Sequence, residues 1–153
     1  MNIFILDKDI KKSATYLPNI YVVKMPVEAT QMLCTVLYIS GCWEDWMYKP
    51  THINHPCTQW VYQSLDNWLW LKEYTIEMGK EYTYRYGKEH KSVCIAEKLP
   101  NPLISSIGLT EFVKCVPHQY IMGDVVESYR KYLIGEKGHL RRYKNREEPN
   151  WWV

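Results

Sequence analysis

Two stretches of the chain combine the apolar period of a helix with a proline near the start and a glycine near the end. In the first, residues 26–41, apolar side chains recur along one face of a helix. Pro26 fits the first helical position, where its missing N–H costs no hydrogen bond, and Gly41 fits the end. Long helices with one apolar face must pack against each other, so this feature favours a helical core.

The second stretch, residues 56–87, predicts one long helix or two helices divided near residues 64–67. Pro56 suits a first turn, and Gly87 suits an end. The other segments are a short strand or extended arm at 2–6, short helices at 7–17, 88–99 and 124–138, a loop at 42–54, and an irregular crossing segment at 101–123. We expect a mainly α protein, a single compact helical domain over residues 1–153 with a short N-terminal extended segment.

Chain length and cysteine content predict the number of domains and the cellular compartment. With 153 residues, the chain is one domain by default and long enough for a core without disulfides. No run of eighteen apolar residues is present, so we expect no membrane span. Five cysteines without framework spacing, together with no secretory signal, predict free thiols in a reducing cytoplasm, that of the host cell if the protein is viral.

Charge and aromatic content each allow two interpretations. The net charge is only +2, yet a basic aromatic C-terminal tail covers about residues 135–153. Basic clusters of this kind contact phosphates or form a solvated helix face. The chain has thirteen Tyr and seven Trp against two Phe, and such side chains stack on nucleic-acid bases or pack half-buried on helices.

Histidines and cysteines occur in two groups. His52, His55 and Cys57 lie within six residues, and Cys115 and His118 are three apart. Imidazole and thiolate ligands suit zinc. Paired CxxC and HExxH motifs are absent, and the two groups would have to meet in the fold, so we expect no metal and no cofactor.

Ionisable side chains at helical spacing suggest an amine beside a carboxylate. Lys24 and Glu28 are four residues apart, and Gln31 shares a helix face with Glu28. The functional interpretation places this carboxylate and amine at the mouth of a site. The alternative is a carboxylate in a first helical turn, where the helix dipole favours it.

The stretch "EYTYRYGKEH", residues 81–90, places acidic and basic side chains among three tyrosines. Glu81 and Arg85 form an i,i+4 pair, which is an ordinary surface ion pair in the simplest interpretation. The functional interpretation is a phosphate-binding cluster of Arg85, Lys88 and His90, with tyrosines stacking on a base.

Three motifs together, "VVKMPVEATQML", "NHPCTQWVYQSLDNWLWL" and "EYTYRYGKEH", resemble small phage and bacterial proteins related to the pyrimidine-dimer DNA glycosylases of the phage endonuclease V type. The resemblance covers roughly residues 20–90, and a weaker resemblance extends over residues 125–138. It implies base excision on a flipped-out nucleotide. An amine attacks the sugar C1′, the base leaves, an imine forms, and the strand can break by elimination. The family's founding enzymes use the α-amine of an N-terminal threonine, whereas this sequence begins Met1–Asn2, so Met1 or Lys24 would supply the amine.

With this resemblance, the residues above predict a site. Glu28 and Lys24 are the expected catalytic residues. His55, which precedes Pro56, either points into the site or caps the helix that follows. Nucleotide or phosphate contacts are assigned to His55, Glu81, Arg85, Lys88, His90 and Arg130, and base stacking to Trp60, Tyr82 and Tyr86.

Three functions remain open from the sequence. The first is a viral or phage DNA glycosylase-like protein acting on a damaged or modified pyrimidine. The second is a non-catalytic viral protein that sequesters a free host immune-signalling nucleotide, which the near-neutral charge favours over a long duplex. The third is a structural or inhibitory module with aromatic anchors. The expected partner is DNA or a free nucleotide, without a membrane, and a homo-oligomer is left open. Nucleotide-dependent motors, dinucleotide enzymes and common hydrolases lose support because their motifs are absent.

Overall fold

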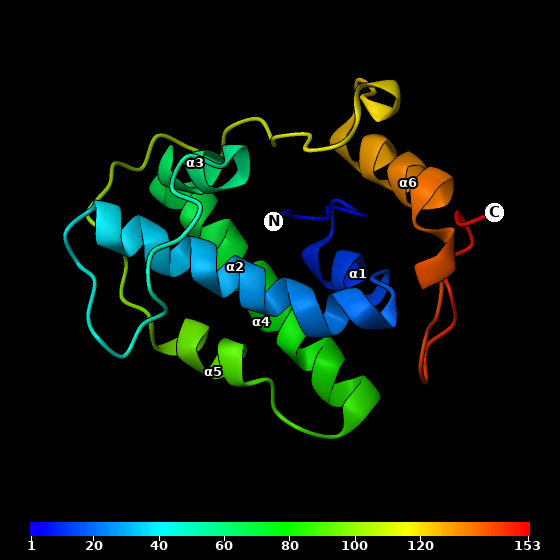
Figure 1. Ribbon diagram of the computed structural model, residues 1–153, viewed down its shortest axis with the longest axis horizontal. Coiled ribbons are helices and arrows are strands. Elements are labelled where there is room, and N and C mark those ends of the chain that lie inside the picture. The colour runs from blue at the N-terminus through cyan, green and yellow to red at the C-terminus, as the bar shows by residue number, and fades with distance from the viewer.

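Six α-helices and two short 3₁₀ turns make up the computed structural model, which describes residues 1–153 and contains no strand (Figure 1). The mainly α prediction is therefore confirmed, and the N-terminal residues form an extended arm. The elements are α1 (Ile10–Thr15), α2 (Asn19–Ile39), α3 (Pro56–Tyr62), α4 (Leu65–Tyr86), α5 (Lys91–Lys98), η1 (His118–Tyr120), α6 (Val125–Glu136) and η2 (Gly138–Leu140).

The two longest helices, α2 and α4, pack against each other through the middle of the molecule, and the shorter helices surround them (Figure 1). One continuous cluster of buried apolar residues joins these helices with the N-terminal arm. Helix α2 is the one helix long and apolar enough to cross a membrane, but 72% of that stretch is buried inside the protein. Its role as the core helix accounts for its apolar composition.

Helix α2 begins earlier than its sequence pattern predicted. Pro18 precedes the first helical residue, whereas Pro26 lies inside the helix, so the prediction that Pro26 opens it was wrong. Tyr21, Val22 and Met25 are buried, and the packing of α2 on α4 outweighs the hydrogen bond that a proline removes. The carbonyl of Pro26 accepts a hydrogen bond from the Thr30 hydroxyl at 2.8 Å. Glu28 consequently lies well within the helix and not in its first turn.

The second stretch forms two helices, one of the two alternatives predicted, and the short helices α1, α5 and α6 lie within their predicted ranges but are shorter. Ser64 divides the second stretch into α3 and α4, and its hydroxyl accepts the Asp66 N–H at 3.2 Å. Helix α4 ends at Gly87, whose φ of 70° lies in the left-handed region. Helix α4 continues through Gly79. The missing side chain lets α5 pack closely, because a Cβ at this position would lie 2.6 Å from Val93 Cγ1.

The N-terminal arm lies in the middle of the fold, and the C-terminal half closes around it (Figure 1). The irregular crossing segment leads to α6, which Asp124 caps by accepting the Glu127 N–H at 3.1 Å. The basic tail packs on the body. Trp152 is buried, and Arg146 pairs with Glu81 on α4 at 2.7 Å. The tail is therefore part of the structure and not a free basic arm.

Candidate functional site

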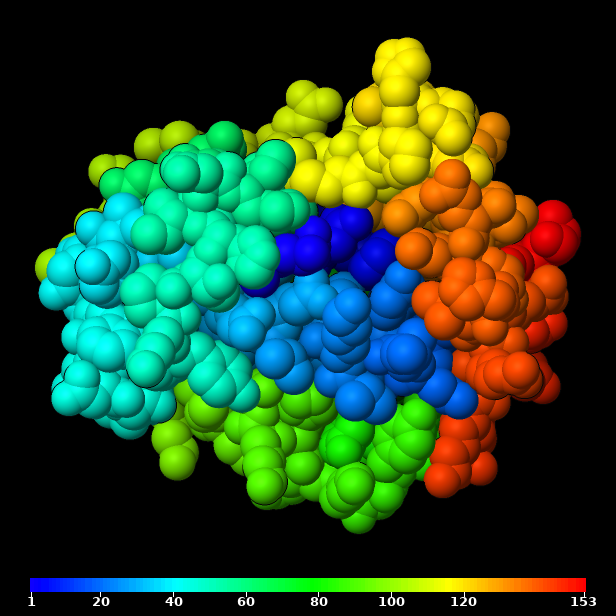
Figure 2. Space-filling view, in the orientation of Figure 1, coloured from blue at the N-terminus to red at the C-terminus, as the bar shows by residue number.

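A cavity of about 220 Å³ opens where the N-terminal arm meets α2 and α6. Figure 2 shows this face: the N-terminal residues lie at the floor of a hollow, with α2 on one side and α6 on another. The cavity is lined by Met1, Asn2, Phe4, Tyr21, Lys24, Met25, Glu28, Tyr132 and Lys137.

Glu28 holds two amines at the floor of this cavity. Its Oε1 lies 3.5 Å from the α-amine of Met1, and its Oε2 lies 3.8 Å from Lys24 Nζ. The same Oε1 accepts the backbone N–H of Asn2 at 3.1 Å. The Glu28 side chain is 12% exposed and that of Lys24 is 62% exposed. A largely buried carboxylate thus faces one buried amine and one exposed amine, of which the spacing of Lys24 and Glu28 suggested the second.

The side chain of Asn2 fixes the arm beside Glu28. Its Oδ1 accepts the Tyr129 hydroxyl at 2.7 Å, and its Nδ2 donates to the Cys115 carbonyl at 2.9 Å. These partners are 127 and 113 residues away in sequence, so no local pattern predicts them. Asn2 therefore positions the arm, a role that sequence reasoning missed.

Stacked rings form the apolar wall of the cavity. Phe4 stacks on Tyr21 with ring centroids 4.4 Å apart, and Tyr132 lies parallel to Phe4 at 6.4 Å. Lys137 Nζ lies 5.5 Å from the centroid of the Tyr132 ring. Burial, Tyr132 and Glu28 together raise the pKa of Tyr21 to about 12, so this phenol stays neutral. Lys137 and the ring stack were not predicted as site residues.

His55 caps a helix next to the same cavity. Its Nδ1 accepts the Cys57 N–H at 3.1 Å, and in that tautomer the proton lies on Nε2. Burial lowers the pKa of His55, and the nearby charges of the Met1 amine and His52 lower it further. His55 therefore caps α3, which is one of the two roles predicted for it. The neutral ring carries its proton on Nε2 and can donate a hydrogen bond from there.

Two cysteines complete the surroundings of this imidazole. Cys57 is buried at the start of α3, and Cys115 lies in the crossing segment with its Sγ 3.5 Å from that of Cys57. Cys57 donates to Cys115, which with the Met1 amine lowers the pKa of Cys115 to about 7. The same hydrogen bond and burial raise the pKa of Cys57. One ring nitrogen of His55 and the sulfur atoms of Cys57 and Cys115 all lie within 4.8 Å of one another.

The predicted cluster around Arg85 lies elsewhere and is buried. The Arg85 side chain has no exposed surface, and its Nε donates to Glu81 at 2.7 Å. Its other N–H groups donate to the carbonyls of Leu17 and Thr15 and to the Asn19 side chain. These bonds join α4 to the segment between α1 and α2. Glu81 and Arg85 therefore do not converge on the Glu28 cavity.

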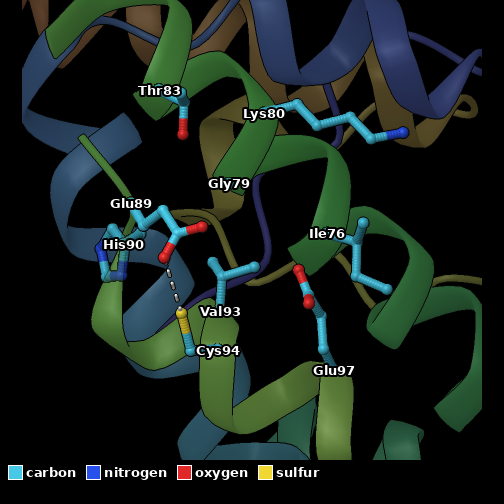
Figure 3. A pocket seen from close by; sticks show the side chains of 9 residues that line it. All are labelled: Ile76, Gly79, Lys80, Thr83, Glu89, His90, Val93, Cys94 and Glu97. Carbon is cyan, nitrogen blue, oxygen red and sulfur yellow. Dashed lines mark hydrogen bonds between the residues drawn. The ribbon is translucent and has the colours of Figure 1, made fainter. Parts of the chain in front are cut away.

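The remaining residues of the "EYTYRYGKEH" stretch also lie apart from Glu28. His90 caps α5, and its Nε2 lies 2.8 Å from the Val23 carbonyl. Tyr82 packs on both His90 and Tyr86, while Lys88 is exposed. Beside them, a cleft of about 300 Å³ between α4 and α5 shares no lining residue with the Glu28 cavity. Figure 3 shows the carboxylates of Glu89 and Glu97 turned toward this cleft, an unsuitable lining for phosphate.

Trp60 and Arg130 have structural partners as well. Trp60 is 2% exposed and packs between Trp70 and Phe112, which leaves no face for a base. Arg130 donates to the Leu6 carbonyl at 2.8 Å and to Asp7 at 3.2 Å. The cavity thus brings together Lys24 and Glu28 with His55 beside them, and leaves the other predicted site residues outside its lining.

The fold and the cavity define an all-helical protein in which a carboxylate faces two amines beside a wall of stacked rings. A family model described as pyrimidine dimer DNA glycosylase matches residues 1–93. The match covers more than half of the chain, which belongs to the pyrimidine dimer DNA glycosylase family. No curated protein and no solved structure matches the chain. Glu28 and His55 lie inside the matched region, whereas Cys115 and Lys137 lie outside it.

Proposed function

We propose that this protein excises a damaged or modified pyrimidine from DNA and that the reaction takes place at Glu28. Family membership supports a glycosylase-like function on DNA in general. The specific proposal rests on one observation: Glu28 lies 3.5 and 3.8 Å from two different amines at the floor of an aromatic-walled cavity.

This arrangement suits covalent chemistry at a sugar carbon. A neutral amine nitrogen bonds to C1′ as the C1′–N bond to the base breaks, and the proton that this nitrogen then loses passes by way of Glu28 to the departing base. Opening of the sugar ring, with a proton from water on O4′, gives an imine. Loss of a C2′ proton to water then breaks the C3′–O bond, and the strand leaves as a phosphate. Glu28 can accept the proton that the amine gives up. Its negative charge also stabilises the positive charge that develops on the sugar.

Groups around the cavity fit the rest of a flipped nucleotide. Lys24 and Lys137 place positive charge at the rim for flanking phosphates. The Nε2–H of His55 is a further donor. Tyr132 is partly exposed and is backed by the buried rings of Phe4 and Tyr21, so its ring is the aromatic surface against which a displaced base can pack.

Borohydride trapping tests the proposal directly. The protein is incubated with duplexes that contain a pyrimidine dimer or an abasic site, and borohydride reduces any imine to a stable adduct. Mass spectrometry of the digested adduct then shows whether the DNA is attached to the α-amine of Met1 or to Lys24. A Lys24→Ala variant should lose only an adduct at Lys24, and Lys98→Ala, which removes an exposed lysine of α5, serves as the control. Absence of an adduct on both duplexes would contradict the mechanism.

A second candidate function is the binding of a free nucleotide without catalysis. The small cavity of about 220 Å³ and the net charge of +2 favour this alternative, because a long duplex is usually bound by many cations. Its test is a thermal-shift panel of mono-, di- and cyclic nucleotides. Stabilisation by one nucleotide, together with no trapped adduct, would favour sequestration over excision.

We also propose that the protein acts in a reducing cytoplasm, that of the host cell if the protein is viral. Five cysteines carry free thiols, and two of them lie 3.5 Å apart without a bond. Such a pair stays reduced where glutathione and thioredoxin are active. Rapid alkylation of intact cells followed by mass spectrometry should find Cys57 and Cys115 as thiols. A Cys57–Cys115 disulfide in those cells would argue against this setting.

A further inference from the structure

We propose that His55, Cys57 and Cys115 form a binding site for a thiophilic divalent cation, of which zinc is the probe. One ring nitrogen and the two sulfur atoms lie within 4.8 Å of one another. The inference goes beyond the proposed excision reaction and does not depend on it, because none of the three residues supplies the attacking amine or the carboxylate.

The spacing of the two sulfur atoms fits a shared metal. Zinc binds thiolates at about 2.3 Å in tetrahedral geometry, which places two sulfur ligands roughly 3.8 Å apart. The Sγ atoms of Cys57 and Cys115 are 3.5 Å apart, so a movement of a few tenths of an ångström brings them to that separation. A disulfide would involve only the two sulfur atoms, whereas a metal would also bind the ring nitrogen of His55 that lies within 4.8 Å of them.

The chemistry of the three ligands also fits a divalent cation. Two thiolates and one imidazole are soft to borderline donors, the set that zinc prefers. The charges of two thiolates cancel that of the cation, so the site adds no net charge beside the Met1 amine. His55 Nδ1, which bears the lone pair while it caps α3, would exchange the Cys57 N–H for the metal. Three protein ligands leave a fourth position for water.

The two sulfur ligands come from segments that are 58 residues apart in sequence. Cys57 lies in the first turn of α3, and Cys115 lies in the crossing segment between α5 and α6, which has only a short 3₁₀ turn of regular structure. Asn2 contacts both, through its Oδ1 to Cys57 Sγ at 3.8 Å and its Nδ2 to the Cys115 carbonyl. A metal here would hold the crossing segment and the arm against α3. The sequence predicted no metal because the two groups of ligands had to meet, and the fold brings Cys57 and Cys115 together.

Metal content and cobalt spectroscopy test this site. Untagged protein, purified under reducing conditions without chelators, should contain one zinc per chain. Cobalt added to the apoprotein should give a thiolate-to-cobalt charge-transfer band and the visible bands of tetrahedral cobalt. We expect Cys115→Ser and His55→Asn each to weaken zinc binding about 100-fold or more, because each removes a ligand and loss of an outer-shell partner alone costs about 10- to 100-fold. Cys94→Ser, which changes a half-buried cysteine of α5, should leave binding unchanged.

Two further measurements separate metal binding from folding and from activity. Zinc should raise the melting temperature of the wild type but not that of Cys115→Ser, whose circular dichroism shows whether it is folded. Borohydride trapping is repeated with excess chelator, so that an adduct without metal supports the excision proposal even if zinc does not bind. Reduced wild-type protein that binds no zinc at micromolar concentration, or binding that survives both ligand variants, would overturn the inference. A Cys57–Cys115 disulfide formed in place of metal binding would also overturn it.

Discussion

Glu28 and Glu81 each meet two positive groups, yet the two carboxylates have opposite surroundings. Glu81 is 4% exposed and contacts Arg85 and Arg146 at 2.7 Å each. Glu28 lies 3.5 Å from Met1 N and 3.8 Å from Lys24, and it borders an open cavity. Short, multiple guanidinium contacts in a buried place fix a structure. Longer contacts to amines beside a cavity leave the groups freer to meet a bound molecule, as the proposed reaction requires. Sequence spacing indicates which residues can pair, whereas distance and exposure distinguish a fixed buried pair from one that borders a cavity.

The largest expected effect is a loss of stability at the buried pair of Glu81 and Arg85. Arg85→Met removes the guanidinium that bonds Glu81 and two carbonyls, and leaves buried polar groups without partners. We expect a loss of about 3–5 kcal/mol in the free energy of unfolding, as for other broken buried pairs. Urea unfolding measures it. Lys80→Met breaks an exposed pair with Glu77 and should cost about 0.5 kcal/mol or less. Native-like stability of Arg85→Met combined with lost DNA binding would restore the phosphate-binding role for Arg85.

The second prediction concerns Glu28, the carboxylate that borders the cavity. Glu28→Gln keeps the shape of the side chain but removes its charge, so the amine and the developing sugar cation lose their stabilising partner. We expect the rate of dimer-specific strand cleavage to fall about 100- to 1,000-fold, the range seen when one electrostatic stabiliser is removed. Single-turnover cleavage of a defined duplex measures it, and the melting temperature should change little. An active Glu28→Gln variant would place the chemistry elsewhere.

A smaller effect is expected at the rim of the Glu28 cavity. Lys137→Ala removes a charge that lies 5.5 Å from the Tyr132 ring and lines the cavity. If this lysine contacts a phosphate, duplex binding should weaken at every sequence, and the slope of log affinity against log salt should fall by about 1. Fluorescence anisotropy at several salt concentrations measures both. Lys98→Ala should leave the slope unchanged. An unchanged slope for Lys137→Ala would show that Lys137 does not contact a DNA phosphate.

The smallest effect is a change in alkaline stability. The pKa of Tyr21 is raised from 10.0 to about 12 in the folded protein. The folded state therefore keeps this proton more tightly than the unfolded state. The stabilisation is complete below pH 10 and is lost as the pH rises from about 10 through 12. Tyr21→Phe should flatten this part of the pH–stability curve, measured by urea unfolding between pH 9 and 11. An identical slope in both proteins would show that Tyr21 ionises as freely folded as unfolded.

Most helices were predictable because their signals are local. Pro56, Ser64 and Gly87 each act within one turn, and all three mark the boundaries that the structure shows. Pro26 misled because a proline inside a buried helix looks the same in sequence as one at its start. The contact between Lys24 and Glu28 was also predictable, since residues four apart share a helix face.

The rest of the site depends on residues that are far apart in sequence. Tyr129 and Cys115 reach Asn2 only through the tertiary fold, and Lys137 arrives with α6. No periodicity links such residues. The i,i+4 spacing of Arg85 and Glu81 was correct, but spacing does not reveal that the pair would be buried. Sequence spacing therefore placed both local pairs in a site, and only the fold shows that Lys24 and Glu28 border a cavity while Glu81 and Arg85 are buried.

The seating of Asn2 has a consequence for how this protein matures. A ribosome makes the amine-bearing arm before it makes Tyr129, yet the arm is held in place by that later hydroxyl. A nascent or truncated chain that ends before α6 would lack the Tyr129 hydrogen bond to Asn2, so the arm would be fixed beside Glu28 only when most of the chain has been made. If the proposed reaction takes place at Glu28, it would start only in the last stage of synthesis.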